Sequence, residues 1–470
     1  MVCTNRPFCP TILIAAQLAQ LTRFVTRKVF MKVLRKLPLS AALALALAAP
    51  AQAQSLVELF ESARSYDAAY QAAKAQYEAS KAKADQALAL LLPTSNLVLS
   101  ANRSGLDYST SSPGVPATNV NFTRWFSSQS AALTASQPLF RPANLAGYSQ
   151  SKKQLSQALA QLVSAEQELV VRISQAYFDV LASQDSLDFV RAQKTAVSEQ
   201  LASAKRNFEV GTATITDTRE AQARFDLVIA QEIAAENDLR VKRLALDQWV
   251  GIKNANPKPL AKAAELKPAM PEDPDRWVQD SETTHPGILN AQLALDIAKL
   301  EIERARAGHK PTVDLQAGYS GTRNLDGTAT SGSVPFSSHV VAPTVSVVMT
   351  VPLFAGFATE NRYRETVSLE EKAKNDLEAA RRNVAQATRA AYFGVVSGIG
   401  QVKALEAAEE SSQVALDANK LGYTVGVRIN IDVLNSQSQL FQTKRDLAKA
   451  RYDVLVGGLK LRQANGTLKI

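Results

Sequence analysis

The sequence predicts a mixed α and β membrane protein, in which four strands per chain contribute to an oligomeric transmembrane β-barrel that long helices continue. Three observations support this fold class: an internal duplication, paired strands with one apolar face, and helical stretches far longer than the globular average. Length alone, at 470 residues, would suggest about three average domains. The duplicated pattern favours a single elongated unit instead.

The first 53 residues have the pattern of a secretory leader. Met31 opens a short basic stretch, an apolar core of about eleven residues follows at 39–49, and a small-x-small cleavage site ends at Ala53. The core is too short to span a bilayer, which needs about 20 residues. We therefore expect a leader at 1–53 and a mature protein that begins at Gln54. The residues before Met31 are either an over-long reading frame or part of an unusually long leader.

The basic character of the chain belongs to this leader. The whole chain has 53 basic and 44 acidic residues, for a net charge of +9. Seven of the basic residues and none of the acidic ones lie in the leader, which leaves 46 basic against 44 acidic residues. That balance argues against nucleic-acid binding. Both cysteines, Cys3 and Cys9, also lie in the leader, so the mature chain has no disulfide and no cysteine to carry a lipid.

One set of landmarks occurs twice in the chain, at a nearly constant offset of 214 to 218 positions. Four landmarks at such an offset are unlikely to arise by chance, so we predict two repeats, at 54–265 and 266–470. The paired landmarks are Leu92-Pro93-Thr94 with Lys310-Pro311-Thr312, Gln137-Pro138-Leu139-Phe140 with Val351-Pro352-Leu353-Phe354, Ala176-Tyr177-Phe178 with Ala391-Tyr392-Phe393, and Gly211 and Asp217 with Gly426 and Asp432.

Each repeat begins with two alternating segments separated by a polar loop. Period two with one apolar face is typical of strands. Strands of about 10 residues joined by long polar loops suit an outer-membrane barrel, and aromatic residues near the loop ends suit its interfaces. The alternative is a soluble β-hairpin. The alternating segments are centred on 97–101 and 131–135 in the first repeat and on 313–319 and 345–351 in the second, with loops at about 104–123 and 320–340.

A long helix and a return helix follow in each repeat. The stretch Tyr148–Val210 has 63 residues without Gly or Pro, and its apolar positions recur about every 3.6 residues. At 1.5 Å per residue it predicts a helix about 95 Å long. Its counterpart in the second repeat is 357–421. The shorter expected helices are 216–250 and 430–465, which return from the long ones, and 287–307 and 55–91, which lead into the strands.

Four strands cannot close a barrel by themselves. An open sheet edge cannot sit in lipid, because each unpaired N–H or C=O group would cost several kcal/mol. If the strands enter a membrane, the chain must therefore assemble with copies of itself. Three copies would give twelve strands, and two or four copies would also satisfy the arithmetic.

At this point the chain resembles the TolC outer-membrane efflux family, over about residues 55–466. The carriers of the resemblance are the duplicated strand, Pro-Leu-Phe and long-helix units, together with two helix turns at 208–217 and 422–434. The resemblance implies a homotrimer, a twelve-strand barrel in outer-membrane lipid, and a tapering helical tunnel in the periplasm. It also implies docking to a periplasmic adaptor and to an inner-membrane pump of the RND or ABC type.

The same resemblance implies a gate at the helix turns. Tyr423 and Arg428 would reach Asp217 and the neighbouring Thr216, and so hold the tunnel entrance shut. The alternative for Asp217 is plain helix capping, since Thr214 and Asp217 have capping-box spacing. Arg428 would then be a solvated charge.

The resemblance also implies an acidic ring at the entrance constriction. Asp432 occupies one position of this ring, whereas the second position is Asn435, a departure that weakens any claim of strong cation selectivity. The turns would form the adaptor-docking surface, although their glycines could simply end the helices. The docking residues are Gly211, Thr212, Gly426 and Val427.

The sequence offers no pattern for enzyme chemistry. The histidines His285, His309 and His339 lie in expected loops without a metal-ligand cluster, and we found neither a phosphate-binding loop nor a nucleophile elbow. We therefore expect no catalysis, no cofactor and no metal. The predicted function is a passive outer-membrane duct for small molecules or proteins. The alternatives are a periplasmic adaptor and a structural coiled-coil protein, and the cargo is left open.

Overall fold

The computed structural model describes residues 54–112, 118–260, 271–326 and 337–469. The chain divides into two units, Met1–Gln54 and Ser55–Ile470. The leader expected at 1–53 lies outside the described residues, so it stays a prediction, as do the repeat boundaries 54–265 and 266–470.

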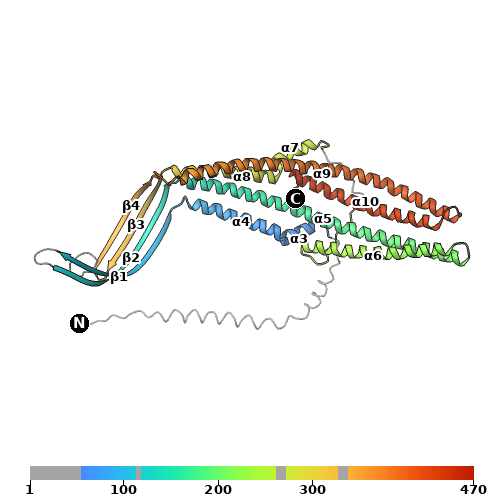
Figure 1. Cartoon of the computed structure of the whole chain (residues 1–470), viewed down its shortest axis with the longest axis horizontal. Helices are drawn as coiled ribbons and strands as arrows, with labels where there is room; N and C mark the ends of the chain where they lie inside the picture. Colours follow the sequence, from blue (N-terminus) through green and yellow to red (C-terminus); the bar gives the residue numbers. More distant parts are fainter. Residues whose placement is uncertain (1–53, 113–117, 261–270, 327–336, 470) are drawn as a thin grey trace, which may run out of the picture. The chain divides into compact units, whose positions relative to one another are not determined.

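Four strands form one antiparallel sheet in the order β1-β2-β3-β4 (Figure 1). The two hairpins, β1–β2 and β3–β4, are joined through pairing of β2 with β3, for example at Leu133 and Tyr319. β1 and β4 are the edges of the sheet. The strands are β1 (Thr94–Ser112), β2 (Thr118–Phe140), β3 (Thr312–Asn324) and β4 (Ser338–Thr350).

The strands are longer than the sequence pattern suggested. β1 has 19 residues and β2 has 23, so most of the loop expected at 104–123 is strand. The loop expected at 320–340 is also shorter, because β3 and β4, of 13 residues each, extend into it. The Ser, Thr and Asn residues that suggested a loop alternate along strands whose other face is apolar. Polar composition alone therefore did not distinguish a loop from the polar face of a strand.

Residues directly opposite in an antiparallel pair lie on the same face of a sheet. The register therefore gathers apolar side chains on one face and polar side chains on the other. Ten side chains of the apolar face are large and exposed: Leu97, Leu99, Trp125, Leu133, Leu315, Tyr319, Val341, Val345, Val347 and Met349. The opposite face carries Asn96, Ser100, Ser130, Thr134, Gln316, Thr322, Thr344 and Ser346. The amphipathic alternation expected from the sequence is confirmed.

The N-terminal helix is broken, contrary to the single helix expected at 55–91. It consists of α3 (Leu56–Tyr66) and α4 (Ala68–Ala89). Asp67 between them has an extended backbone, with ψ of 119°, and its side chain accepts the N–H of Tyr70 as an N-cap. The break therefore follows from a residue that ends one helix and caps the next.

The long helices and their return helices match the sequence pattern closely. α5 (Pro142–Glu209) has 68 residues and α9 (Ala358–Thr424) has 67, which corresponds to about 100 Å each. α6 (Ile215–Val250) and α10 (Asn430–Asn465) return from them. α5 begins before the expected Tyr148 because Pro142 is well suited to a first helical turn.

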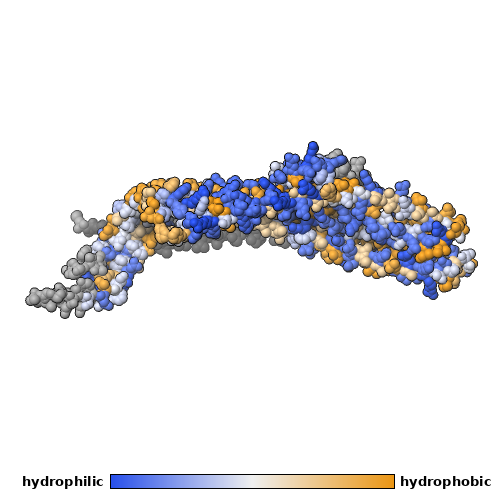
Figure 2. All heavy atoms as spheres, turned by 45° about the horizontal axis from the view of Figure 1, so that its top comes forward, coloured by the Kyte–Doolittle hydropathy of each residue, from blue (hydrophilic) through white to orange (hydrophobic). Residues whose placement is uncertain are grey.

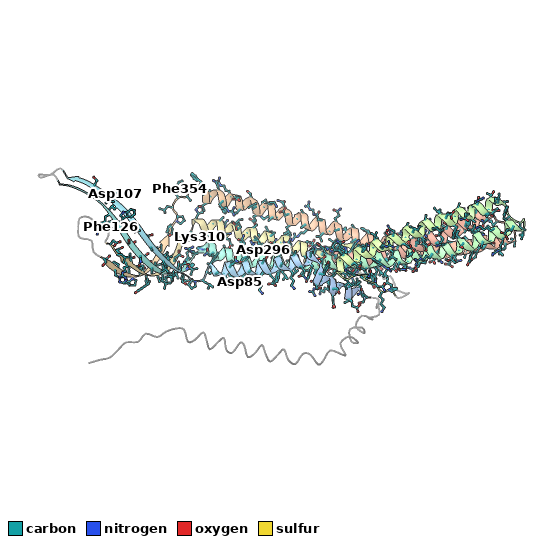
Figure 3. All side chains as sticks on the ribbon, turned by 90° about the horizontal axis from the view of Figure 1, so that it is seen from below. Asp85, Asp107, Phe126, Asp296, Lys310 and Phe354 are labelled. Atoms are coloured by element: carbon teal, nitrogen blue, oxygen red, sulfur yellow. The ribbon has the colours of Figure 1, made fainter. Side chains whose placement is uncertain are left out.

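Shorter helices connect these hairpins to the sheet. α8 (Pro286–Arg306) confirms the helix expected at 287–307, and a 3-10 turn, η1 (Ala307–His309), leads to β3. α7 (Pro274–Thr284), capped by Asp273, was not expected. α5 packs against α4, α6, α8 and α10, whereas α9 packs against α7, α8 and α10. Lys310 and Phe354 lie where the strands meet the helices (Figure 3).

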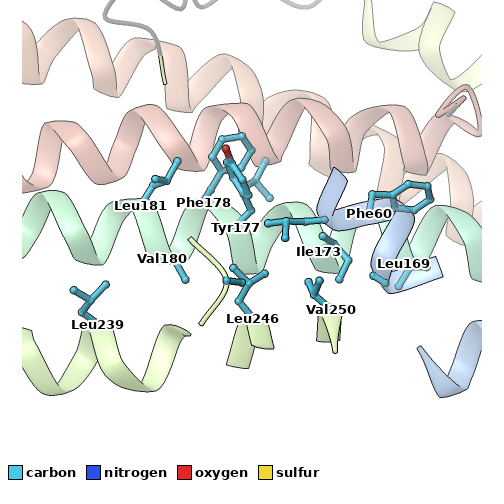
Figure 4. Close-up of a cluster of buried hydrophobic side chains, with 14 of the residues drawn as sticks. Phe60, Leu169, Ile173, Tyr177, Phe178, Val180, Leu181, Leu239, Leu246 and Val250 are labelled. Atoms are coloured by element: carbon cyan, nitrogen blue, oxygen red, sulfur yellow. The ribbon is translucent and has the colours of Figure 1, made fainter. Parts of the chain in front are cut away.

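The largest buried cluster joins α3, α5, α6 and α10 (Figure 4). Leu59, Ile173 and Leu246 have no exposed surface in it. Of the apolar stripe expected on the long helix, Leu169, Ile173 and Val180 are buried. This stripe therefore packs against the return helix, as the 3.6-residue period indicated.

The two tyrosines of the duplicated Ala-Tyr-Phe motif have equivalent roles. Tyr177 of α5 donates its hydroxyl to the carbonyl of Lys258 at 2.7 Å, after α6. Tyr392 of α9 donates to the carbonyl of Glu272, just before α7. Burial raises the pKa of Tyr177, which keeps the phenol protonated as a donor. The two long helices thus each hold one end of the connection between α6 and α7.

Removing either hydroxyl should loosen that connection. We expect Tyr177→Phe and Tyr392→Phe to cost about 1 kcal/mol each, since each leaves a carbonyl without its partner. Hydrogen exchange of the backbone amides in 252–258 and 272–275 should rise by about five- to tenfold. Tyr363→Phe is the control, because its hydroxyl accepts only from the exposed Arg306. Unchanged exchange in both variants would contradict this role.

Candidate functional site

The two helical hairpins, α5–α6 and α9–α10, end in turns of similar construction. Gly211 in the first turn has φ of 80° and Gly426 in the second has φ of 78°, a left-handed conformation that is open to glycine. In the first turn the N–H of Thr212 returns to the carbonyl of Asn207 at 2.8 Å. The second turn closes in the same way. Both glycines therefore end their helices, as one interpretation of the sequence expected.

Asp217 caps the start of α6. Its N–H donates to the Thr214 hydroxyl at 3.2 Å, and its carboxylate accepts the Thr214 N–H at 2.9 Å. The capping box expected from the spacing is therefore confirmed. Its carboxylate also accepts the Thr214 hydroxyl at 2.7 Å. The side chain is thus engaged within its own turn.

Tyr423 and Arg428 do not contact Asp217 or Thr216 within the described chain. Tyr423 accepts a hydrogen bond from Asn207 at 3.3 Å, which still joins α9 to α5. Arg428, in the turn before α10, lies 3.7 Å from the carboxylate of Asp432 in the first turn of that helix. Within one chain Asp217 and Arg428 each have a nearer partner on their own hairpin. The gate contacts expected from the resemblance therefore stay a prediction.

Asp432 and Asn435 lie in the first two turns of α10. Asp432 is in the first turn, where a carboxylate also favours the helix dipole. Asn435 is exposed and accepts a hydrogen bond from Arg224 of α6 at 2.7 Å. Asn435 thus links the two hairpins, a contact that its place in the acidic ring did not suggest.

Asn430 is a buried polar link between the hairpins that the sequence reasoning missed. Its side chain has no exposed surface, and its amide oxygen accepts from Gln200 of α5 at 2.5 Å. Its amide nitrogen donates to the backbone carbonyl of Asp217 at 3.2 Å. The signal was present, because Asn430 lies three and four positions before the buried Val433 and Leu434 and so shares their face.

Apolar packing surrounds this link. Leu434 of α10 has no exposed surface and inserts between α5 and α6, against a cluster that contains Leu201 and Ala221. Ile431 packs against the same cluster. The tip of one hairpin is therefore held to the other by a buried leucine and a buried amide together.

A second polar contact lies farther along the interface between α5 and α10. Gln193 of α5 is buried, donates to Ser438 at 3.4 Å and accepts from Arg445 at 3.1 Å, both on α10. Beyond it, Tyr452 donates to Asp185 at 2.7 Å. Burial raises the pKa of the Asp185 carboxyl. The interface between α5 and α10 thus contains polar contacts at intervals along its length.

The turns expose apolar side chains to solvent, which Figure 2 shows as hydrophobic colour at the end of the helices. Val427 is 78 % exposed and Val210 is 73 % exposed. Thr212 is exposed as well, beside the turn glycine. Exposed apolar side chains at a projecting turn are suited to contact with another protein. The expected docking role of these residues stays a prediction.

The described residues contain no group of three or more side chains able to hold a metal ion. None of the described helices is both long and apolar enough to cross a bilayer. The arrangement at the turns is therefore one of contacts between helices, with capped ends and one buried polar link.

Comparison with known proteins gives a consistent family match. A family model described as "Outer membrane efflux protein" matches residues 59–252 and 277–467. The chain is 31% identical over 439 residues to "Outer membrane protein TolC" of Vibrio cholerae serotype O1, covering 93% of this chain and 96% of that relative. It is 31% identical over 422 residues to "Alkaline protease secretion protein AprF" of Pseudomonas aeruginosa, covering 88% of this chain and 85% of that relative.

Solved structures share the fold. A crystal structure of CusC superimposes with a TM-score of 0.74 at 18% identity, covering 87% of this chain and 92% of that chain. The outer membrane protein VceC from Vibrio cholerae superimposes with a TM-score of 0.71 at 18% identity, covering 87% of this chain and 96% of that chain.

Proposed function

The chain belongs to the outer membrane efflux protein family, and on that premise we propose that it is the channel subunit of a tripartite efflux or type I secretion system. It lies in the outer membrane. It would act as a passive duct from the periplasmic pump assembly to the exterior, with energy supplied by the pump.

One observation carries this proposal, namely a sheet with one apolar face, one polar face and two open edges. β1 and β4 have no partner on their outer sides within the described chain. Because lipid offers no hydrogen bonds to these edges, neighbouring subunits must supply them. We propose a homotrimer with twelve strands, in which the polar face lines the lumen. The matching lengths of α5 and α9, and of α6 and α10, support its construction from two repeats.

The gate would lie at the turns of the helical hairpins. We propose that Tyr423 and Arg428 meet Asp217 and Thr216 of a neighbouring subunit, since these contacts are not made within one chain. Asp432 would form the acidic part of the constriction. Opening would then require both these contacts and the link at Asn430 to break.

The partners would be a periplasmic adaptor and an inner-membrane pump of the RND or ABC type. The adaptor would dock on the exposed turns at Gly211, Thr212, Gly426 and Val427. One relative is named for alkaline protease secretion and another for solvent efflux, so both proteins and small molecules are candidate cargoes.

Conductance of the purified protein tests this function. Wild-type protein in planar bilayers should form channels of small conductance, and replacing Tyr423 by phenylalanine together with Arg428 by serine should raise that conductance several-fold. Outer-membrane fractions should also contain oligomer bands that dissociate on heating, which a periplasmic adaptor would not give. A monomer that stays soluble without detergent would exclude the proposal.

A further inference from the structure

Two arginines interrupt the apolar face of the sheet at a single level. Arg323 of β3 lies in the same row as Gln129 of β2 and His339 of β4, because these residues are directly paired. Arg103 of β1 lies on the same face, one row nearer the hairpin loops. The next row on that face carries Trp125, and Arg103 lies 5.7 Å from its ring centroid.

The position of this level matches the edge of a membrane. Arg323 is ten residues along β3 from Val313, where the apolar face begins, which is about 33 Å of strand. At a tilt of 35–45° this corresponds to about 25 Å of height, the thickness of the apolar band of an outer-membrane barrel. The end of the sheet that joins the helices lies at the opposite edge of this apolar band. With the helices in the periplasm, Arg323, Arg103 and Trp125 lie at the outer leaflet.

Neither guanidinium has an ionic partner among the described residues. The ion pairs of this part of the chain include neither Arg103 nor Arg323, although Asp107 lies on the same face of β1 and Asp326 follows the end of β3. Asp107 is four residues along β1 from Arg103, about 13 Å away. A third arginine, Arg124, belongs to the opposite face and donates to the backbone carbonyl of Asp326 at 3.0 Å.

A groove of about 560 Å³ adjoins Arg323. Leu99, Ala131, Gly321, Arg323 and His339 line it from the apolar face, together with Ala101 and Gln129 of the Arg323 row and with Ser100 and Ser130. Arg323 and Arg103 are separated by two strand spacings and one row, or about 12 Å. The groove is thus apolar toward the membrane centre and cationic at its outer end.

We propose that this surface binds a phosphorylated glycolipid of the outer leaflet, with phosphates on Arg323 and Arg103 and an acyl chain in the groove. Guanidinium groups bind phosphate with paired hydrogen bonds, and two arginines whose backbone positions lie about 12 Å apart suit a headgroup that carries two phosphates. The position of Trp125 agrees with placing this level of the sheet at the lipid headgroups, since indole rings favour that interface. The site rests on the proposed outward orientation of the apolar face.

Native mass spectrometry of the detergent-solubilised oligomer tests the site. The probe is a diphosphorylated glycolipid of the outer leaflet, titrated into delipidated protein. We expect Arg103→Gln with Arg323→Gln to weaken binding about 30-fold, because each cation near an anionic surface contributes about a fivefold factor. Arg124→Gln should bind as the wild type does, because Arg124 belongs to the polar face.

Two further measurements distinguish binding of the phosphorylated lipid from binding of the acyl chains alone or of free phosphate. The enzymatically dephosphorylated glycolipid should bind about as weakly as the double variant, and millimolar inorganic phosphate should not displace the intact lipid. The inference is overturned if the double variant binds within twofold of wild type, if Arg124→Gln loses as much, or if phosphatidylglycerol binds equally well. Channel conductance is measured on the same samples. Conducting oligomers without selective lipid binding would overturn this site alone, whereas absence of conducting oligomers in the wild type would overturn the channel function.

Discussion

Replacing Asn430 by alanine should raise the open fraction of the channel by about tenfold or more. The change removes two hydrogen bonds that join α10 to the other hairpin, one from Gln200 at 2.5 Å and one to the carbonyl of Asp217 at 3.2 Å. Both hydrogen bonds are shielded from solvent, because Asn430 has no exposed surface. Leaving buried partners unsatisfied costs about 1–3 kcal/mol. In the proposed gate only the closed arrangement makes these bonds, so the cost would fall on that state and shift the equilibrium toward opening.

Single-channel recordings in planar bilayers measure this effect. Gln200→Ala should act in the same direction, and the double variant should open little more than either single one, because both remove the same bond. Gln442→Ala is the matched control, since its side chain bonds only to Asp446 and Arg445 within α10. An open fraction that stays at the wild-type level in the Asn430 variant would exclude this residue from the gate.

The sequence predicted the helices well because periodicity and breakers report directly on them. The long apolar stripe and the turn glycines placed α5, α6, α9 and α10 within a few residues, except at the start of α5. The break at Asp67 was missed because neither Gly nor Pro marks it; Asp67 ends α3 and caps α4, and its carboxylate also accepts a hydrogen bond from Arg172, 105 positions away. The full length of the strands was missed because serine and threonine suit both a loop and the polar face of a strand.

The candidate site was harder to predict for a different reason. Gly211 and Asp217 act through local backbone geometry, which sequence spacing encodes. Arg428 can pair with any carboxylate within reach of its long side chain, and in a single chain it pairs with Asp432 in the first turn of α10. Asn430 could have been found, because an asparagine on a buried stripe needs a polar partner. Its partners, however, come from 213 and 230 positions away.

The second large expected effect concerns stability. Replacing Arg172 by leucine should destabilise the folded protein by about 3 kcal/mol or more. Arg172 lies 3.1 Å from the carboxylate of Asp67, whose side chain is 4% exposed, and its guanidinium stacks on Trp249 at 4.8 Å. Removing the arginine leaves a buried carboxylate without a counter-charge at the junction of α3 and α4. We expect the apparent midpoint of thermal unfolding, followed by helical circular dichroism, to fall by about 3–4 °C, since a chain of this length loses about 1 °C per kcal/mol.

Two further variants separate charge burial from simple loss of an arginine. Arg191→Leu also removes a paired arginine from α5, but its own side chain is 51% exposed, Glu236 is exposed and Glu232 keeps Lys194 at 2.7 Å, so the midpoint should change by about 1 °C or less. In the Arg172→Leu background, Asp67→Asn should recover part of the loss, because asparagine removes the buried charge and still caps α4. If Arg172→Leu and Arg191→Leu shifted the midpoint equally, the ion pair would contribute no more than an exposed one. The helix break at Asp67 would then depend on capping alone.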